Sequence, residues 1–221
     1  YLHLRAMGGG DFNDFAKGYY PVFNRQGLII DVRHNRGGNI DSWVLSRLMR
    51  KAWMYWNQPA GRGPTWNMQY AFRGHIVVLC NERTASDGEA FSEGFRRLGL
   101  GKVMGTRTWG GEIWLSSSNT VVDGGLASAG ENGVFDADGV WLIEGRGVEP
   151  DIIVDNLPHA AGEQALMLEF STSAASYCIA IPTCSLEGVR NEGAFDQAAV
   201  TALEEEPYEA YNDQVEGDVG E

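Results

Sequence analysis

The chain has 221 residues, of which 43% are hydrophobic and 11% aromatic, enough to bury the core of one domain with or without an appendage. The formal net charge is −13, but residues 187–221 alone carry −10, so residues 1–186 carry only −3. This nearly balanced main part excludes a basic face for nucleic acid, and no apolar run approaches the ~20 residues that span a bilayer.

The N-terminal region predicts a strand end at residues 1–4, a helix over residues 11–20, a buried strand over residues 27–32 and a second helix over residues 40–52. The last two form a strand–loop–helix unit. Because Tyr1 stands within the first strand with no signal pattern before it, we expect the chain to be a fragment of a longer protein, with any targeting segment upstream.

A glycine pair, Gly37 and Gly38, ends the loop of this unit. Without a Cβ, the backbone can approach a ligand closely and aim a peptide N–H at it, so the pair fits an oxyanion or anion cradle. The same residues also suit a plain chain reversal, and the local sequence favours that simpler interpretation.

A second strand–loop–helix unit is centred on Ser86. Residues 75–80 form a short apolar run typical of a buried strand, and from Asp87 apolar residues recur at three- and four-residue intervals, which predicts a helix to about Leu98. A serine at such a junction presents its hydroxyl beside the free N–H groups of the first helical turn, as a nucleophile requires. With Glu89 three residues on, Ser86 also fits a capping box that only closes the helix, and the local pattern favours this cap.

Two consecutive units of this kind indicate an α/β fold with a parallel sheet, whose loops emerge at the edge where such sheets place their sites. Gly38 and Ser86 should therefore share a rim. Between the units, residues 53–72 are rich in tryptophan, tyrosine, proline and glycine, and we expect their aromatic side chains to pack over the sheet, with part of the segment as a candidate lining of a substrate pocket.

The pattern then changes to short strands and turns. Asp138-Gly139 marks a hairpin turn, and residues 106–111 are expected to form a loop. Short strands are predicted at residues 102–105, 120–122, 133–135, 140–143 and 152–154.

Glu144 directly follows one of these predicted strands, at its inner end. An unpaired carboxylate in such a place is costly, so we expect Glu144 either to be functional or to pair with Arg107 or Arg146.

Organisation weakens toward the C-terminus. Residues 160–170 are expected to form a helix, a further helix is expected near residues 195–205, and the chain from Pro207 on is expected to be disordered. The three cysteines do not make a disulfide framework and the four histidines lie near none of them at zinc-ligand spacing, so no metal site is predicted.

Three long segments occur in an order and at distances typical of one peptidase family: GLIIDVRHNRGG, NERTASDGEAFSEGFRRLGLGKVMGTRTWGG and IEGRGVEPDIIVDNLPH. Together they resemble the tricorn-like branch of the tail-specific, or C-terminal processing, serine peptidases. The resemblance covers residues 1–160 and implies a catalytic subdomain with a crotonase-like (Clp/crotonase) spiral of β-β-α units. Residues 161–221 would be a helical and largely unassigned acidic tail.

The resemblance implies roles for several residues at the predicted rim. Ser86 is similar to the nucleophile, and the N–H groups of Asp87 and Gly38 are similar to the oxyanion donors, with Gly37 the less suited of the glycine pair. Glu144 is similar to the carboxylate that supports a serine and a histidine from an upstream subdomain. The loop that would lie beside the bound peptide contains Trp109, Gly110 and Gly111.

One branch of this family activates its serine with a lysine about two dozen residues downstream, but no lysine stands there in this chain, which favours the branch with a histidine base. That histidine would precede a PDZ-like domain upstream of this sequence, so this chain alone is expected to be inactive or weakly active. His34 is a less favoured substitute. The family has an acidic residue that binds basic substrate side chains at P1, the position before the cleaved bond. This chain has Tyr55-Trp56 there, which predicts a preference for apolar side chains at P1.

We therefore expect a serine endopeptidase or oligopeptidase that works through an acyl-enzyme and needs no metal or cofactor. The resemblance implies peptide substrates, PDZ-like and histidine-bearing subdomains of the same protein, a homo-oligomer and a cytoplasmic location, although exported relatives leave the compartment open. The alternatives are an acyl-coenzyme A enzyme of the crotonase type, which shares the fold and the oxyanion hole, and a non-catalytic peptide-binding relic.

Overall fold

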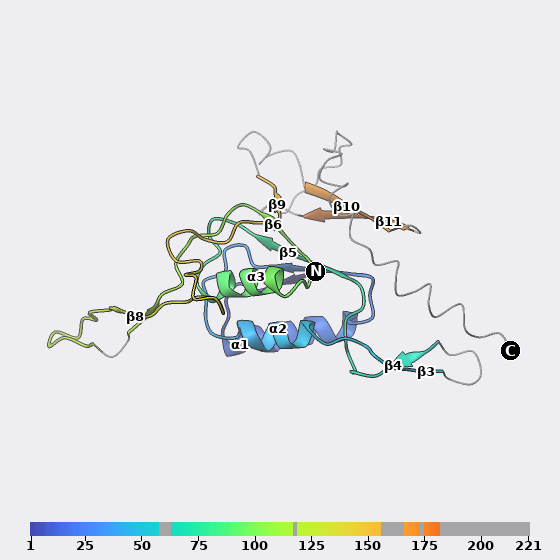
Figure 1. Ribbon diagram of the computed structural model, residues 1–221, viewed down its shortest axis with the longest axis horizontal. Helices are drawn as coiled ribbons and strands as arrows, with labels where there is room; N and C mark the ends of the chain where they lie inside the picture. Colours follow the sequence, from blue (N-terminus) through green and yellow to red (C-terminus); the bar gives the residue numbers. More distant parts are fainter. Residues whose placement is uncertain (58–62, 117–118, 156–165, 173–174, 182–221) are drawn as a thin grey trace. The chain divides into compact units, whose positions relative to one another are not determined.

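The computed structural model describes residues 1–57, 63–116, 119–155, 166–172 and 175–181. The chain divides into two compact units, Tyr1–Asp155 and Asn156–Glu221. The first unit holds a central sheet, three α-helices and two projecting hairpins (Figure 1), and the second holds one described hairpin.

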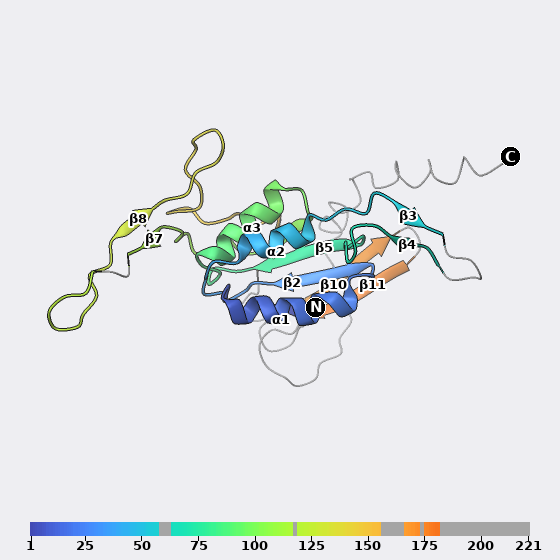
Figure 2. The same ribbon diagram turned by 90° about the horizontal axis from the view of Figure 1, so that it is seen from below.

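Five strands form the central sheet of the first unit, in the order β1-β2-β5-β6-β9, and every neighbouring pair is parallel. The inner strands are runs of leucine, isoleucine and valine that are buried on both faces, as parallel sheets require. Because the strands share one direction, the loops after β2, β5 and β6 all leave from the C-terminal end of the sheet (Figure 2). The strands are β1 Leu2–His3, β2 Gly27–Asp31, β5 His75–Cys80, β6 Lys102–Gly105 and β9 Ile152–Ile153.

The three α-helices cover one face of this sheet (Figure 1). Even-numbered residues 28–30 of β2 and 76–80 of β5, with Val32 just after β2, form one buried cluster with apolar side chains from all three helices. In the third helix, Phe91 and Phe95 lie one turn apart and are both fully buried, which stabilises the layer by ~1.5–3 kcal/mol for each ring. The helices are α1 Gly9–Tyr19, α2 Asp41–Leu48 and α3 Asp87–Arg97, with a 3-10 turn, η1, at Tyr20–Val22.

The elements predicted for both strand–loop–helix units are confirmed, with differences at their ends. The helix predicted over residues 40–52 ends at Leu48, because the chain continues into the hairpin formed by β3 (Tyr55–Trp56) and β4 (Thr65–Trp66). Trp53, Tyr55 and Trp56 are exposed, so the expectation that this aromatic segment packs over the sheet is wrong for them.

The short strands predicted at residues 120–122, 133–135 and 140–143 are wrong. The structure has only isolated bridges there, Thr120 to Leu126 and Phe135 to Trp141, because each reversal closes after a single residue pair. The second bridge flanks Asp138-Gly139 and confirms the hairpin turn.

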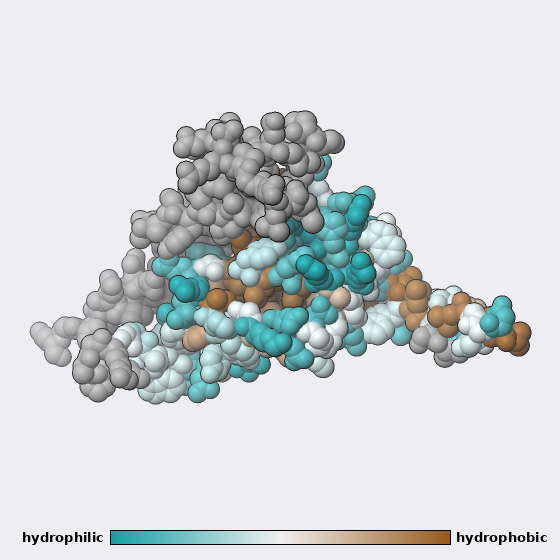
Figure 3. All heavy atoms as spheres, turned by 180° about the vertical axis from the view of Figure 1, so that it is seen from behind, coloured by the Kyte–Doolittle hydropathy of each residue, from teal (hydrophilic) through white to brown (hydrophobic). Residues whose placement is uncertain are grey.

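A longer hairpin, β7 (Trp114–Leu115) with β8 (Gly130–Asn132), projects from the end of the first unit opposite to β3 and β4 (Figures 1 and 2). It exposes large apolar side chains, seen as brown atoms along the arm in Figure 3. They include Trp114, Leu115, Val121, Val122 and Leu126.

The described part of the second unit is an antiparallel hairpin of β10 (Leu166–Thr172) and β11 (Ala175–Ile181). The helix predicted over residues 160–170 is therefore wrong from Leu166 on, because seven cross-strand pairs override the helix propensity of its leucine and methionine residues. The helix expected near residues 195–205 and the disorder expected from Pro207 lie outside the described residues. Among the helices described, none is both long and apolar enough to cross a membrane.

Candidate active site

Ser86 occupies a sharp turn between β5 and α3, with φ 53° and ψ −129°. Residues with a side chain rarely adopt this conformation, which costs ~1–3 kcal/mol and persists only where the surroundings impose it. Thr84 helps to do so, since its hydroxyl donates to the carbonyl of Val32 at 2.8 Å and accepts from the N–H of Asn81 at 3.0 Å. Ser86 is half-buried.

The strain at Ser86 predicts a measurable stability difference. Both Ser86→Gly and Ser86→Ala remove the hydroxyl, but only glycine relieves the positive φ, so the glycine variant should be more stable by ~1–2 kcal/mol in chemical denaturation. The matched control is Ser46, an exposed residue inside α2, where the order should reverse by ~1 kcal/mol because glycine weakens a helix. If the alanine variant were the more stable one at position 86 as well as at position 46, Ser86 would not be strained.

Gly37 packs directly against Ser86. A Cβ built on Gly37 would lie 2.5 Å from the Cβ of Ser86 and 2.9 Å from its Oγ, and the φ of 82° also favours glycine. At Gly38, with φ 154°, a Cβ would lie 1.9 Å from the carbonyl oxygen of Met7. Both positions therefore require glycine because Ser86 approaches Gly37 and Met7 approaches Gly38 too closely for a Cβ, and not only because the chain reverses there.

The peptide between Gly37 and Gly38 has a fixed orientation. Its carbonyl accepts from the N–H of Met7 at 2.8 Å, and since the two groups of a trans peptide point in opposite directions, the N–H of Gly38 points away from Met7. Within the part of the chain that the structure describes, neither this N–H nor that of Asp87 donates a hydrogen bond. Both amides are thus available to an acceptor beside Ser86.

Asn35 connects the glycine loop to the serine turn, a role that sequence reasoning missed. It is fully buried, donates from Nδ2 to the carbonyl of Leu4 at 2.7 Å, and accepts from the N–H of Gly37 at Oδ1 at 2.8 Å. Its own carbonyl accepts from the N–H of Ala85 at 3.0 Å. The only signal in the sequence was a polar residue between charged neighbours and two glycines.

Glu89 is a second connector, and sequence reasoning gave it only a capping role. Its Oε2 does accept from the N–H of Ser86 at 3.1 Å, as in a capping box, but it also accepts from Gly111 at 2.9 Å. Its Oε1 accepts from the N–H of Gly110 at 2.7 Å and from the hydroxyl of Thr108 at 2.5 Å. This fully buried carboxylate therefore fixes the loop over residues 106–111 to the serine turn.

The same loop also contacts both neighbouring segments directly. Trp109 donates its N–H to the carbonyl of Thr84 at 3.1 Å while its ring is 68% exposed, and Gly110 accepts from the N–H of Gly145 at 2.8 Å. At Gly110, with φ 90°, a Cβ would lie 2.9 Å from the backbone nitrogen of Gly147. The loop predicted to lie beside a peptide is therefore held at the rim.

Glu144 lies in an exposed turn, and its predicted place at the inner end of a strand is wrong because Ile143 has φ 63°. Its Oε2 accepts from the N–H groups of Glu112 and Ile113 at 2.7 and 2.9 Å. The described contacts of Glu144 thus do not include the arginine pairing that we considered. Glu144 thus binds the two N–H groups that directly follow those of Gly110 and Gly111, which Glu89 binds.

Asp87 points away from Ser86 and closes the start of α2. Its Oδ2 accepts from the N–H groups of Ile40 and Asp41 at 2.7 and 3.0 Å. Burial raises the pKa of Asp87 to about 6, although the hydrogen bond from the N–H of Ile40 lowers this pKa by stabilising the carboxylate. The side chain is therefore structural, while the backbone nitrogen of the same residue lies beside Gly37, 3.3 Å from where a Cβ on Gly37 would stand.

Glu112 is buried beside these carboxylates, and its Oε2 has no hydrogen-bond partner among the described residues. Burial raises the pKa of Glu112 to about 8, and the charges of Asp87, Glu89, Asp41 and Glu144 add to the shift. Glu112 is the second acidic residue at the rim that sequence reasoning missed as a site residue.

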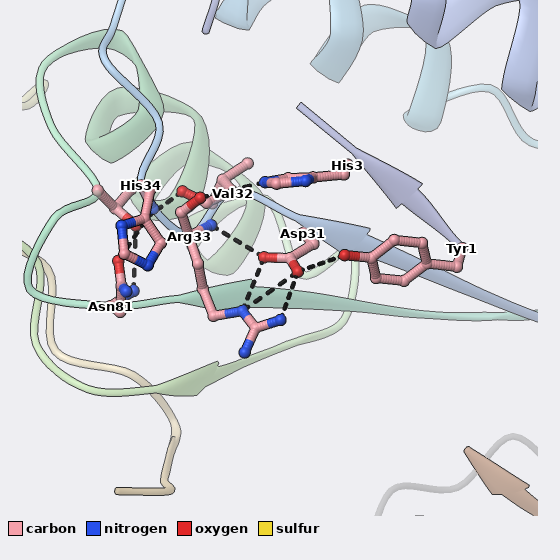
Figure 4. Close-up of polar contacts among 8 residues, drawn as sticks. Tyr1, His3, Asp31, Val32, Arg33, His34 and Asn81 are labelled. Carbon is pink, nitrogen blue, oxygen red and sulfur yellow. Dashed lines mark hydrogen bonds and ion pairs between the residues drawn. The ribbon is translucent and has the colours of Figure 1, made fainter. Parts of the chain in front are cut away.

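His34 does not reach Ser86 in the described contacts. Its N–H donates to Oδ1 of Asn81 at 3.0 Å and its side chain is exposed at the end of β2 (Figure 4). Beside it, Asp31 is held by Arg33 and by the hydroxyl of Tyr1 at 2.6 Å. Burial opposes ionisation of Asp31, but these hydrogen bonds outweigh it and lower the pKa, so the group is a paired structural carboxylate.

Tyr55 and Trp56 also lie away from Ser86. They belong to β3, which lies near the N-terminal ends of β2 and β5 (Figure 2). Ser86 follows the C-terminal end of β5. Within the described residues, no group of three or more histidine, cysteine, aspartate or glutamate side chains is arranged to hold a metal ion.

Comparisons with known proteins identify the family of this chain. The model of peptidase family S41 matches residues 1–154. The chain is 35% identical over 159 residues to the tricorn protease of Thermoplasma acidophilum and 37% identical over 164 residues to tricorn protease homolog 1 of Streptomyces coelicolor. These matches cover 72% and 73% of this chain but only 15% of each relative.

A solved structure of the tricorn protease superposes with a TM-score of 0.67 at 35% identity, over 72% of this chain and 15% of that one. The matched region contains the strained serine, the glycine pair and the loop that Glu89 holds. The chain therefore belongs to peptidase family S41.

Proposed function

We propose that this chain is the nucleophile-bearing part of a serine peptidase that cleaves peptide bonds through an acyl-enzyme. Ser86 Oγ attacks the peptide carbonyl carbon, the C–N bond breaks as the amine leaves with a proton, and water then hydrolyses the ester. The observation that carries the proposal is the strained, half-buried Ser86 packed on Gly37, with two amides that donate to no described residue.

The amides of Gly38 and Asp87 would hold the oxyanion. Each such donor is commonly worth about 3 kcal/mol of activation free energy, because a backbone N–H is already oriented before charge develops. Asn35 and Glu89 support this role indirectly, since they fix the glycine loop and the 106–111 loop to the serine turn. Trp109, Gly110 and Gly111 would form the neighbouring wall for the peptide.

The proton acceptor in this proposal is a histidine outside the present sequence, supported by Glu144. The two relatives described above are named as a tricorn protease and a tricorn protease homolog, which supports peptide substrates. The crotonase-like spiral, the subdomain boundary at residue 160, the PDZ-like and histidine-bearing subdomains, the homo-oligomer and the cytoplasmic location stay predictions from the family resemblance.

A fluorophosphonate probe tests the proposal in the full-length protein. Ser86 Oγ should form a bond to phosphorus as fluoride leaves, and labelling should disappear in Ser86→Ala while the exposed Ser46→Ala keeps it. Mass spectrometry of the labelled peptide identifies the site. An acyl-coenzyme A enzyme needs no hydroxyl at position 86, and a binding relic would not react, so labelling that does not depend on Ser86 would contradict the proposal.

A further inference from the structure

Glu112 is a buried carboxyl group for which the proposed reaction has no use. Its side chain is 4% exposed, and its buried Oε2 has no partner in the described part of the chain. Buried polar atoms are satisfied in the great majority of cases, so an exception at an active-site rim requires an explanation.

The four charged groups that contribute most to the raised pKa of Glu112 are acidic. Asp87 and Glu89 belong to α3, Asp41 begins α2, and Glu144 belongs to the turn after the β7–β8 segment. The hydrogen bonds that Asp87, Glu89 and Glu144 accept come from backbone N–H groups and one threonine hydroxyl, so no basic side chain of the described residues donates to them. A further negative charge at Glu112 would be repelled from several directions in a medium of low polarity.

Glu112 is also mechanically linked to Ser86. The two residues before it, Gly110 and Gly111, donate their N–H groups to Glu89, which also holds the N–H of Ser86. The N–H of Glu112 itself is held by Glu144 at 2.7 Å. This series of bonds joins the backbone at Glu112 to the backbone of Ser86.

We propose that Glu112 is a positioning residue of the Ser86 site that must be neutral. When protonated, its side chain stays buried and the loop over residues 106–111 stays on Glu89; when ionised, the side chain leaves the core and draws that loop away from Ser86. The proton passes to solvent, and no other bond changes. The inference rests on the proposed function, because its consequence is a loss of Ser86 reactivity at alkaline pH.

The test is the rate of fluorophosphonate labelling of the full-length protein between pH 6 and pH 10, in the wild type and in Glu112→Gln, which is neutral at every pH. A carboxyl group that titrates near pH 8 is about ten to one ionised at pH 9. The wild type should therefore lose reactivity through this range and react about tenfold more slowly than Glu112→Gln at pH 9. At pH 6 the two rates should agree within about twofold, whereas a merely structural role would change both ends equally.

Glu131→Gln is the matched control, since Glu131 is exposed on β8, and its profile should follow the wild type. If Glu112→Gln does not fold, Glu112→Met offers a second neutral side chain of similar length with the same expected profile. Labelling at Ser86 with coincident wild-type and Glu112→Gln profiles would overturn the role of Glu112 alone. Absence of Ser86-dependent labelling at every pH would overturn the proposed function and this inference with it.

Discussion

Gly37→Ala is expected to slow peptide hydrolysis by the full-length protein about 1,000- to 10,000-fold. The new Cβ would lie 2.5 Å from the Cβ of Ser86 and 2.9 Å from its Oγ, so either the serine turn or the glycine loop must move by a considerable fraction of an ångström. A displacement of about 1 Å commonly costs a factor near 100, so a smaller one should cost about 10, and loss of one oxyanion donor costs a further factor of about 100 to 1,000. The expected fall is in kcat, because the displaced groups act on the transition state.

The control is Gly10→Ala, inside α1, where a Cβ meets nothing within 4 Å. It should leave the rate unchanged and stabilise the helix by ~0.5–1 kcal/mol. Circular dichroism at the assay temperature separates a displaced site from an unfolded protein, because the strain at φ 82° should cost only ~1–3 kcal/mol. A folded Gly37→Ala variant with normal kcat would mean that the contact with Ser86 does not position the nucleophile.

The same substitution at two buried glutamates is expected to change stability in opposite directions. Each carboxylate oxygen of Glu89 accepts two hydrogen bonds. Glu89→Gln replaces one oxygen with an NH2 group, which cannot accept from those two donors, so it should lower the free energy of unfolding by ~3–5 kcal/mol. Glu112→Gln removes a carboxyl without a described partner, and should raise the free energy of unfolding at pH 7 by on the order of 3 kcal/mol.

The pH dependence of the second change has a definite sign. The pKa of Glu112 is about 8 in the folded chain and near 4.5 in the unfolded one, so the folded state retains the proton longer. Its contribution to stability is fully present below pH 4.5 and is lost as the pH rises through 8. Urea denaturation at pH 4.5, 7 and 9 should therefore show a gap between Glu112→Gln and the wild type that opens with pH. A constant gap would assign the effect to packing instead.

The amino-acid sequence by itself was sufficient for the sheet-forming units. The strand at residues 75–80 and the helix after Ser86 follow from a continuous apolar run and a three-to-four-residue period, and both were found within one residue of their ends. Where pairing depends on distant residues the prediction was wrong: Leu166–Thr172 has the composition of a helix, but it forms a strand because Ala175–Ile181 pairs along its full length.

The sequence likewise determined which residues to consider at the rim, because chain direction in a parallel sheet brings the loops after β2 and β5 to one edge. It was not sufficient to distinguish a cap from a nucleophile at Ser86, since both have the same local pattern. The nucleophile role follows from the family resemblance and stays a prediction. The structure adds the backbone strain at Ser86 and the close approach of Gly37, which a cap does not need and which join segments 49 residues apart in the sequence.

Only the tertiary structure decided which partners the buried acidic residues have. Glu89 and Glu112 have the same side chain and are both buried, but one accepts four hydrogen bonds and the other has no described partner for its Oε2. Periodicity and propensity report which side chains leave water, because they depend on neighbours along the chain. Whether a buried carboxyl group is ionised depends on donors and charges from other elements, which become its neighbours only when the chain has folded.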